Sequence, residues 1–286
     1  MTFFQVFMLA VVQGVAELLP VSSSAHVIVA QKLMGLDPTA PEMTLMLVML
    51  HTGTMFAVIC YFWKAWKEAF FASPSLFRRS VCLLFIATAC TGAVGLVLKQ
   101  AIEKIVLGGT PHAEIELLFG NMNLIAASLF AVGLLIVTAG IMGKRSGEEK
   151  PVGLRESWLI GVVQGLCLPF RGFSRSGATI SAGLLLGVAK MRAEEFSFAL
   201  AVVLTPPVIA REVLRLLKAR ESMGAVGAGH AVIFYQGMVG MGLSFLAGMV
   251  ALRWLSRWLE RGRWQLFGVY CLCASLVVFI LQRHGF

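Results

Sequence analysis

Polar side chains interrupt an apolar stretch close to the beginning of the chain. Gln13 and Glu17 are four residues apart, so they share one face of the helix that the surrounding residues predict. Pro20 ends or kinks this helix, and three serines follow it before a second helix that contains His26. A carboxylate, hydroxyl groups and an imidazole can transfer protons or attack phosphorus, and a helix N-terminus offers free N–H groups to an anion. This helix break therefore predicts a site for a phosphate group.

Glu17 is the strongest indication of a site, because it is the one acidic residue deep inside an apolar block and an ionisable group in a membrane is costly. The alternative is a polar cluster that only packs helices together around a buried histidine. A lone histidine would favour that alternative, whereas glutamate, serine and histidine at one helix break favour function. The catalytic candidates in this region are Glu17, Ser23 and His26, and the phosphate-binding candidates are Gln13, Ser22 and Ser24.

A second polar cluster, residues 171–179, separates two later apolar helices and contains two arginines, three hydroxyl side chains and two glycines. Glycines let the backbone approach a ligand, and arginine forms paired hydrogen bonds with phosphate. Either Ser174 or Ser176 can cap the helix that starts near Ala178. The alternative is a cytoplasmic loop with incidental arginines. The phosphate-binding candidates here are Arg171, Gly172, Ser174, Ser176, Gly177 and Thr179, and the catalytic candidate is Arg175, whose charge can stabilise phosphoryl oxygens.

The elements that must position these clusters are those of a membrane protein. Of the 286 residues, 58% are hydrophobic and 14% are charged, against about 25% charged in soluble domains, and the mean hydropathy is +0.83. This composition excludes a disordered chain, a collagen and an ordinary soluble globule. Long uncharged blocks near the ~20 residues of a spanning helix favour an all-α polytopic fold over an outer-membrane barrel.

The apolar blocks fall into two kinds. Some are short or broken by polar residues, which is typical of re-entrant helices, and the others approach spanning length. We predict two re-entrant helix pairs and about six spanning helices. The blocks are 3–19, 43–63, 81–98, 122–142, 158–170, 178–189, 196–210, 231–252 and 265–281, of which 3–19, 158–170 and 178–189 are the short or broken ones.

The net charge of +9 comes from basic residues in short segments between the apolar blocks. The positive-inside rule predicts that segments 64–79, 143–156 and 253–263 face the cytoplasm and that segment 99–120 faces outward. Segment 211–230 is also basic, and only the alternation of spans assigns it to the outside. Nucleic acid is an unsuitable partner, because no basic run alternates with stacking aromatic residues.

An internal repeat supports this layout. Residues 11–14 recur as residues 162–165, and each copy is followed by a proline, a serine-rich turn and an apolar helix. An odd number of spans per copy inverts the second copy, and inverted repeats bring their broken helices together near the membrane interior. Chance similarity of two apolar segments is the alternative. The predicted organisation is one membrane domain, 1–286, with repeat 1 at 1–142, a loop at 143–156 and repeat 2 at 157–286.

Cofactor signals are weak. No carboxylate-rich metal motif is present, and none of the six cysteines forms a C-x-x-C pair. The metal requirement stays open, because a divalent cation, Mg²⁺ or Ca²⁺, can accompany a diphosphate. His51 lies within an apolar span. It either lines the pocket or belongs to a packed polar cluster, and the sequence favours neither interpretation.

At residues 13–26 and 172–179 the chain resembles the undecaprenyl-diphosphate phosphatases of the bacitracin-resistance family. The pattern at residues 195–198 also matches, and the resemblance extends over nearly the whole chain in spacing and hydropathy. It implies a multi-pass hydrolase of the bacterial cytoplasmic membrane with interdigitated inverted repeats. Such an enzyme converts undecaprenyl diphosphate to undecaprenyl phosphate and phosphate, which recycles the lipid carrier for cell-wall synthesis and confers bacitracin resistance.

The family pattern also implies roles for single residues. Glu17, His26 and Arg175 correspond to its essential residues, with Ser23 beside them. Gln13 and Arg171 depart from the pattern, because they stand where the family often has glutamate and proline. His26 attacks the terminal phosphorus or activates Ser23 or water, and the sequence does not choose among these.

Two other functions compete with hydrolysis. A polyprenyl-phosphate transporter or flippase also uses inverted repeats. A lipid phosphatase of the phosphatidic-acid type would need a Pro-Ser-Gly-His motif, which is missing. The expected partners are a polyprenyl diphosphate and membrane lipids. The sequence does not determine whether the protein forms an oligomer.

Overall fold

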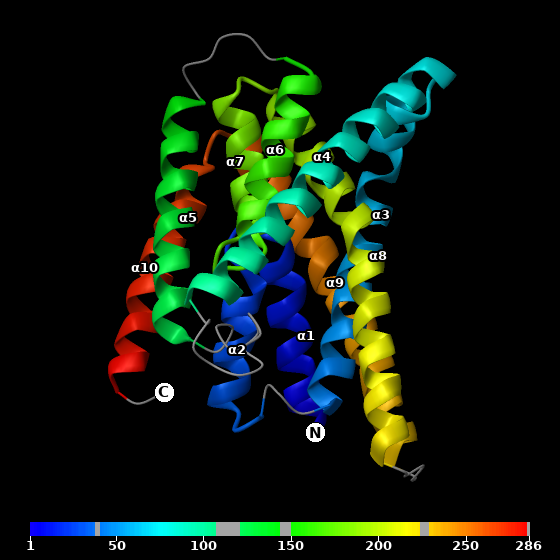
Figure 1. The fold of residues 1–286 in the computed structure, drawn as a ribbon, viewed down its shortest axis with the longest axis vertical. Helices are drawn as coiled ribbons and strands as arrows, with labels where there is room; N and C mark the ends of the chain where they lie inside the picture. The colour runs from blue at the N-terminus through cyan, green and yellow to red at the C-terminus, as the bar shows by residue number, and fades with distance from the viewer. Residues whose placement is uncertain (38–40, 107–120, 144–149, 224–228, 285–286) are drawn as a thin grey trace.

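The chain folds into a bundle of helices (Figure 1), described here from a computed structural model. The structure describes residues 1–37, 41–106, 121–143, 150–223 and 229–284, and among these it contains no β-strand. This confirms the predicted all-α fold. The helices are α1 (Phe3–Leu18), α2 (Ser23–Leu33), α3 (Pro41–Phe70), α4 (Pro74–Ala101), the π-helix η1 (Ile102–Val106), α5 (Met122–Met142), α6 (Leu154–Cys167), α7 (Arg175–Leu185), α8 (Lys190–Met223), α9 (Gly229–Glu260) and α10 (Gln265–Arg283).

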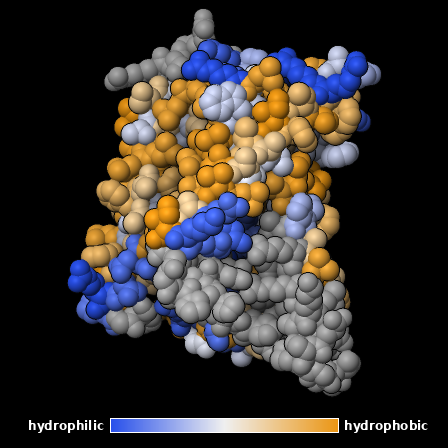
Figure 2. Space-filling view, in the orientation of Figure 1, coloured by the Kyte–Doolittle hydropathy of each residue, from blue (hydrophilic) through white to orange (hydrophobic). Residues whose placement is uncertain are grey.

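Five helical stretches in the described part of the chain are long and apolar enough to cross a membrane, close to the expected six. They are Leu45–Phe70, Pro74–Ile105, Met122–Met142, Phe234–Glu260 and Gln265–Arg283. Figure 2 shows one face of the molecule, with apolar residues over its middle and hydrophilic residues gathered at its upper end. The protein is therefore a multi-pass membrane protein.

Several predicted boundaries are wrong, because helices continue beyond the apolar blocks. Residues 64–70 belong to α3, and α9 continues to Glu260, so two predicted basic loops are largely helix ends. Residues 211–223 extend α8 past the predicted end of its block at residue 210. Lysine, arginine and glutamate end an apolar pattern without ending a helix, because their helix propensities are high.

The short helices form two hairpins, α1–α2 and α6–α7, which lie toward opposite ends of the molecule in Figure 1. Helix α1 packs against α9 from the second half of the chain, and α6 packs against α4 from the first half. The repeated Gln-Gly motif forms both contacts. A Cβ atom on Gly14 would lie 2.6 Å from the Cβ of Ala247, and one on Gly165 would lie 2.7 Å from the Cβ of Val94. Small residues allow this close approach. The repeat boundaries themselves stay a prediction.

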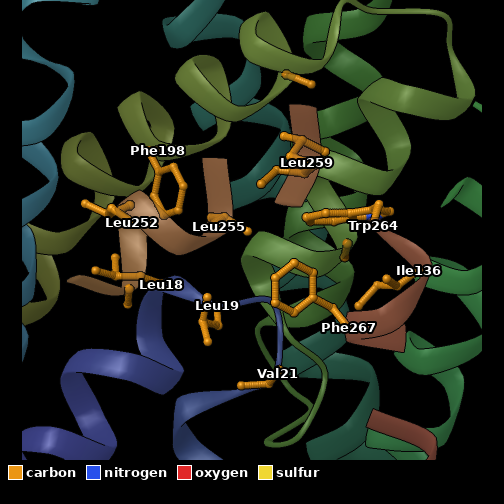
Figure 3. Close-up of a cluster of buried hydrophobic side chains, with 14 of the residues drawn as sticks. Leu18, Leu19, Val21, Ile136, Phe198, Leu252, Leu255, Leu259, Trp264 and Phe267 are labelled. Carbon is orange, nitrogen blue, oxygen red and sulfur yellow. The ribbon is translucent and has the colours of Figure 1, made fainter. Parts of the chain in front are cut away.

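A buried apolar cluster joins the two halves beside the first helix break. Leu18, Leu19 and Val21 contribute from that break, and most of the other side chains of the cluster come from α3 and from helices α5 to α10 (Figure 3). Trp264 is 2% exposed, and its indole N–H donates a hydrogen bond to Ser181 Oγ at 3.0 Å. The break that carries the polar candidates is thus anchored on a packed core.

Candidate active site

Glu17 is the centre of a polar network at the end of α1. Its Oε1 accepts a hydrogen bond from Arg175 Nη2 at 2.7 Å, and its Oε2 accepts one from Ser23 Oγ at 2.5 Å. Gln13 Nε2 also donates to Oε2, at 3.1 Å. Ser23 is the first residue of α2 and Arg175 is the first residue of α7. Glu17 and Arg175 are 158 residues apart in the chain, so their contact joins the two helix breaks. The repeat predicts this meeting.

The first break, residues 19–22, places Ser23 beside Glu17 through an unusual backbone. Ser22 has a φ of 68°, the one positive φ of a non-glycine residue in the described ranges. The Val21 N–H donates to the Leu19 carbonyl at 2.7 Å, which closes a three-residue turn. Ser22 forms no side-chain capping bond with α2. Since a positive φ is strained for residues other than glycine, this turn is held by its surroundings.

The second break, residues 168–174, uses residues suited to their conformation. Ser174 Oγ accepts a hydrogen bond from the Gly177 N–H at 3.2 Å, so Ser174 rather than Ser176 caps α7. Gly172 has a φ of 113°, and a Cβ atom there would lie 2.6 Å from the Ile125 carbonyl oxygen. Only glycine fits this turn, which fixes the start of α7 and the direction of Arg175.

A small open cavity lies beside the Glu17–Arg175 ion pair, between α1, α3, α7 and α8. The side chain of Arg175 is 31% exposed, against 13% for Glu17, so the guanidinium is the more accessible of the two charges. One part of the wall is polar and the other is apolar, as an amphipathic anion requires. The polar lining residues are Glu17, His51, Thr54, Arg175, Ser176, Ser197 and Thr205, and the apolar ones are Leu18, Met55, Val58, Phe198, Ala201 and Val202.

Of the four catalytic candidates, Glu17 and Arg175 line this cavity and Ser23 and His26 do not, which differs from the expected placement in one pocket. His26 instead faces α10. Its Nδ1 lies 2.8 Å from the Ser22 carbonyl oxygen, and its Nε2 lies 2.7 Å from the hydroxyl of Tyr270. The imidazole also stacks on the Tyr270 ring, with the centroids 5.6 Å apart. The α2 helix turns this side chain toward α10, and its proposed catalytic role stays a prediction. Tyr270 had no distinguishing signal in its apolar block.

Most of the remaining candidates lie outside the cavity lining, and some of them hold its helices together. Thr179 Oγ1 lies 2.6 Å from Ser197 Oγ on α8 and donates to the Arg175 carbonyl at 2.8 Å, which ties α7 to α8. Among the phosphate-binding candidates, Ser176 alone belongs to the cavity lining described above. The candidates outside the lining are Gln13, Ser22, Ser24, Arg171, Gly172, Ser174, Gly177 and Thr179.

Four polar lining residues were not among the site candidates, namely His51 and Thr54 of α3 and Ser197 and Thr205 of α8. His51 Nε2 lies 3.5 Å from Glu17 Oε2, so the structure decides the open question about this side chain in favour of the cavity. Ser197 belongs to the pattern at residues 195–198 that matched the family, which was the sequence signal for it.

Comparison with known proteins gives a consistent result. The model of the family "Bacitracin resistance protein BacA" matches residues 6–277. The chain is 54% identical over 282 residues to "Undecaprenyl-diphosphatase 2" of Acinetobacter baylyi, covering 98% of each chain. It is 31% identical over 278 residues to "Undecaprenyl-diphosphatase" of Rhodopirellula baltica, covering 97% of each. It is 34% identical over 286 residues to "Undecaprenyl-diphosphatase 1" of Burkholderia pseudomallei, covering 96% of this chain and 94% of the relative.

Proposed function

Because the chain belongs to the bacitracin resistance protein BacA family, we propose that it hydrolyses undecaprenyl diphosphate to undecaprenyl phosphate and inorganic phosphate. This reaction recycles the lipid carrier of cell-wall synthesis in the bacterial cytoplasmic membrane. It also removes the diphosphate that bacitracin binds, which explains resistance. The hydrolase, rather than a transporter, is the function that the relatives' names support.

The main observation behind this proposal is the Glu17–Arg175 pair beside a cavity with polar and apolar walls. A diphosphate needs a cation and hydrogen-bond donors at its oxygens, and an isoprenoid needs apolar surface. Arg175 supplies the cation at the N-terminus of α7, where the helix dipole also favours an anion. Met55, Val58 and Val202 offer apolar surface for the first part of the lipid chain.

The hydrogen bond to Glu17 supports Ser23 as the attacking group, and Ser23 itself is buried and, like His26, lies outside the cavity lining. Ser23 donates to Glu17 Oε2 at 2.5 Å, so Glu17 is placed to accept its proton. In the proposed step the bond from Ser23 Oγ to the terminal phosphorus forms, and the bond from that phosphorus to the lipid-phosphate oxygen breaks. Water then cleaves the phosphoserine and restores the hydroxyl. His26 Nε2 would first have to leave the Tyr270 hydroxyl before it could attack.

A divalent cation is a separate part of the proposal. Within the described residues, no three His, Cys, Asp or Glu side chains are grouped as metal ligands. We propose that any Mg²⁺ or Ca²⁺ enters bound to the diphosphate, where it neutralises charge on the phosphate oxygens. Turnover that falls with EDTA and returns with added Mg²⁺, without metal in the purified protein, would support this.

The test of the function is phosphate release from undecaprenyl diphosphate by the purified protein in detergent. Hydrolysis needs no sealed membrane, whereas transport does. Glu17→Ala and Arg175→Ala should each lower turnover at least ~100-fold, because the first removes the acceptor of the Ser23 proton and the second removes the cation that binds the reacting phosphate. Glu68→Ala and Arg79→Ala remove exposed charges outside the cavity lining and are the matched controls. Full turnover in both site variants would refute the proposal.

A further inference from the structure

His51 extends from α3 into the cavity beside the ion pair, and its side chain is 38% exposed. We propose that protonated His51 binds a phosphate oxygen of the substrate together with Arg175, so that phosphate affinity depends on the charge of this histidine. The inference rests on the proposed function, because it assigns a ligand group to the same cavity. It adds a second cation to a site for which the sequence predicted only arginine.

The hydrogen bonds of His51 fix its tautomer. Its Nδ1 lies 2.8 Å from the Leu47 carbonyl oxygen, and a carbonyl oxygen only accepts hydrogen bonds, so Nδ1 carries a hydrogen. In the neutral ring Nε2 is therefore an acceptor, and it faces the acceptor Oε2 of Glu17 at 3.5 Å. A proton on Nε2 turns this unfavourable contact into an ion pair and creates a donor at the cavity.

The charges around the cavity show why that proton matters. The charged groups that face His51 in the cavity lining are Glu17 from α1 and Arg175 from α7, and the lining residues of α8 are hydroxyl-bearing or apolar. With a neutral imidazole, Glu17 and Arg175 cancel each other. Protonated His51 makes the lining positive by one charge, which favours an anion.

Glu17 leaves His51 free to turn toward a ligand. The carboxylate already accepts hydrogen bonds from Arg175, Ser23 and Gln13. The 3.5 Å separation from His51 is longer than a charge-assisted hydrogen bond of about 2.7–2.9 Å. An Nε2–H group can therefore point to a phosphate oxygen without breaking the network that holds Glu17.

The backbone near His51 is fixed by packing. A Cβ atom on Gly53 would overlap the Met241 carbonyl and Ser244 Oγ on α9. Ser244 Oγ also donates to the Leu50 carbonyl at 2.9 Å, which binds the same turn of α3 to α9. A rigid support of this kind is what a ligand-binding side chain requires.

The experiment measures binding of inorganic pyrophosphate to the detergent-purified protein by calorimetry between pH 5.5 and 8.5. The parent, His51→Gln and His51→Lys are compared at each pH, so that the titration of the probe itself cancels. His51→Gln should weaken binding about tenfold at pH 5.5 and have little effect at pH 8.5. His51→Lys should bind at pH 8.5 more tightly than the parent, because lysine keeps its charge. The exposed His284→Gln is the control.

A constant ratio of dissociation constants between His51→Gln and the parent across this pH range would overturn the inference. Lysine binding no tighter than glutamine at pH 8.5 would overturn it as well. Phosphate release from the lipid diphosphate is measured separately on the parent protein. If the parent binds pyrophosphate as expected but releases no phosphate, the proposed function fails while the assignment of His51 stands.

Discussion

The two helix breaks meet the same carboxylate but hold their backbones in different ways. In the first break, residues 19–22, Ser22 has a φ of 68° and makes no side-chain cap. In the second, residues 168–174, the positive φ falls on Gly172, and Ser174 caps α7. A non-glycine residue in such a conformation costs on the order of 1–3 kcal/mol. The first break therefore stores strain that the second avoids.

The breaks also contribute different groups from corresponding positions. Ser23 is the first residue of α2 and contacts Oε2 of Glu17, and Arg175 is the first residue of α7 and contacts Oε1. The Glu17 carboxylate thus contacts a hydroxyl group from the strained break and a cation from the unstrained break. On the proposed mechanism, the strain lies beside the attacking group, whereas the cation needs only a stable helix end.

The sharpest test of this division is Ser23→Ala. Loss of the hydroxyl that Glu17 contacts should lower turnover about 100-fold to 10,000-fold, because no proton can pass from Ser23 to the carboxylate. The measurement is phosphate release in detergent, and the control is Ser75→Ala at the exposed start of α4. Undiminished turnover in Ser23→Ala, with a phosphorylated His26 trapped instead, would assign the chemistry to the imidazole and break the comparison.

The second break can be tested through Gly172→Ala. A Cβ atom would lie 2.6 Å from the Ile125 carbonyl oxygen at a φ of 113°, so strain and overpacking together should cost about 2–4 kcal/mol of unfolding free energy. Thermal unfolding in detergent provides the measurement. Gly35→Ala is the matched control, because Gly35 has a φ of 67° but no atom within 4 Å of the added Cβ. Equal effects at both glycines would show that the contact with α5 adds nothing.

The sequence predicted the membrane fold from local patterns and the meeting of the breaks from the internal repeat. Long uncharged blocks indicate spanning helices, Pro20 ends α1, and the serine-rich turns mark new helix starts. The contact between Glu17 and Arg175 followed from the repeat, because inverted copies bring their breaks together. These features need no knowledge of side-chain packing.

The sequence did not predict which histidine faces the cavity. His26 and His51 both lie in apolar surroundings, and hydropathy does not state toward which neighbour a helix face turns. His26 contacts Tyr270 of α10 and His51 contacts Glu17 of α1, so partners far along the chain decide the outcome. The helix ends near residues 64–70 and 211–223 were missed because charge was taken as the end of a helix.

A smaller effect is expected from Ser174→Ala, which removes the cap of α7. The Gly177 N–H would lose its partner at 3.2 Å, at a cost of about 1 kcal/mol. Ser73→Ala removes an equivalent bond to the Leu76 N–H at the exposed start of α4. Both variants should unfold at similarly lowered temperatures, and only Ser174→Ala should raise the KM for the lipid diphosphate. An unchanged KM would show that the cap does not position Arg175.

The stability change from Ser22→Gly can be as small as zero, because two opposing effects partly cancel, and its sign tests the strain directly. Glycine adopts a φ of 68° without steric cost, but it loses about 0.5–1 kcal/mol through the greater freedom of the unfolded chain. Ser22→Gly should therefore be between neutral and ~2.5 kcal/mol more stable than Ser22→Ala, which lacks the hydroxyl but keeps the strain. Thermal unfolding of the two variants measures this difference. If the first break uses strain to hold Ser23 against Glu17, turnover in the glycine variant should fall below that of the alanine variant. Equal turnover would mean that the strain is a by-product of the turn.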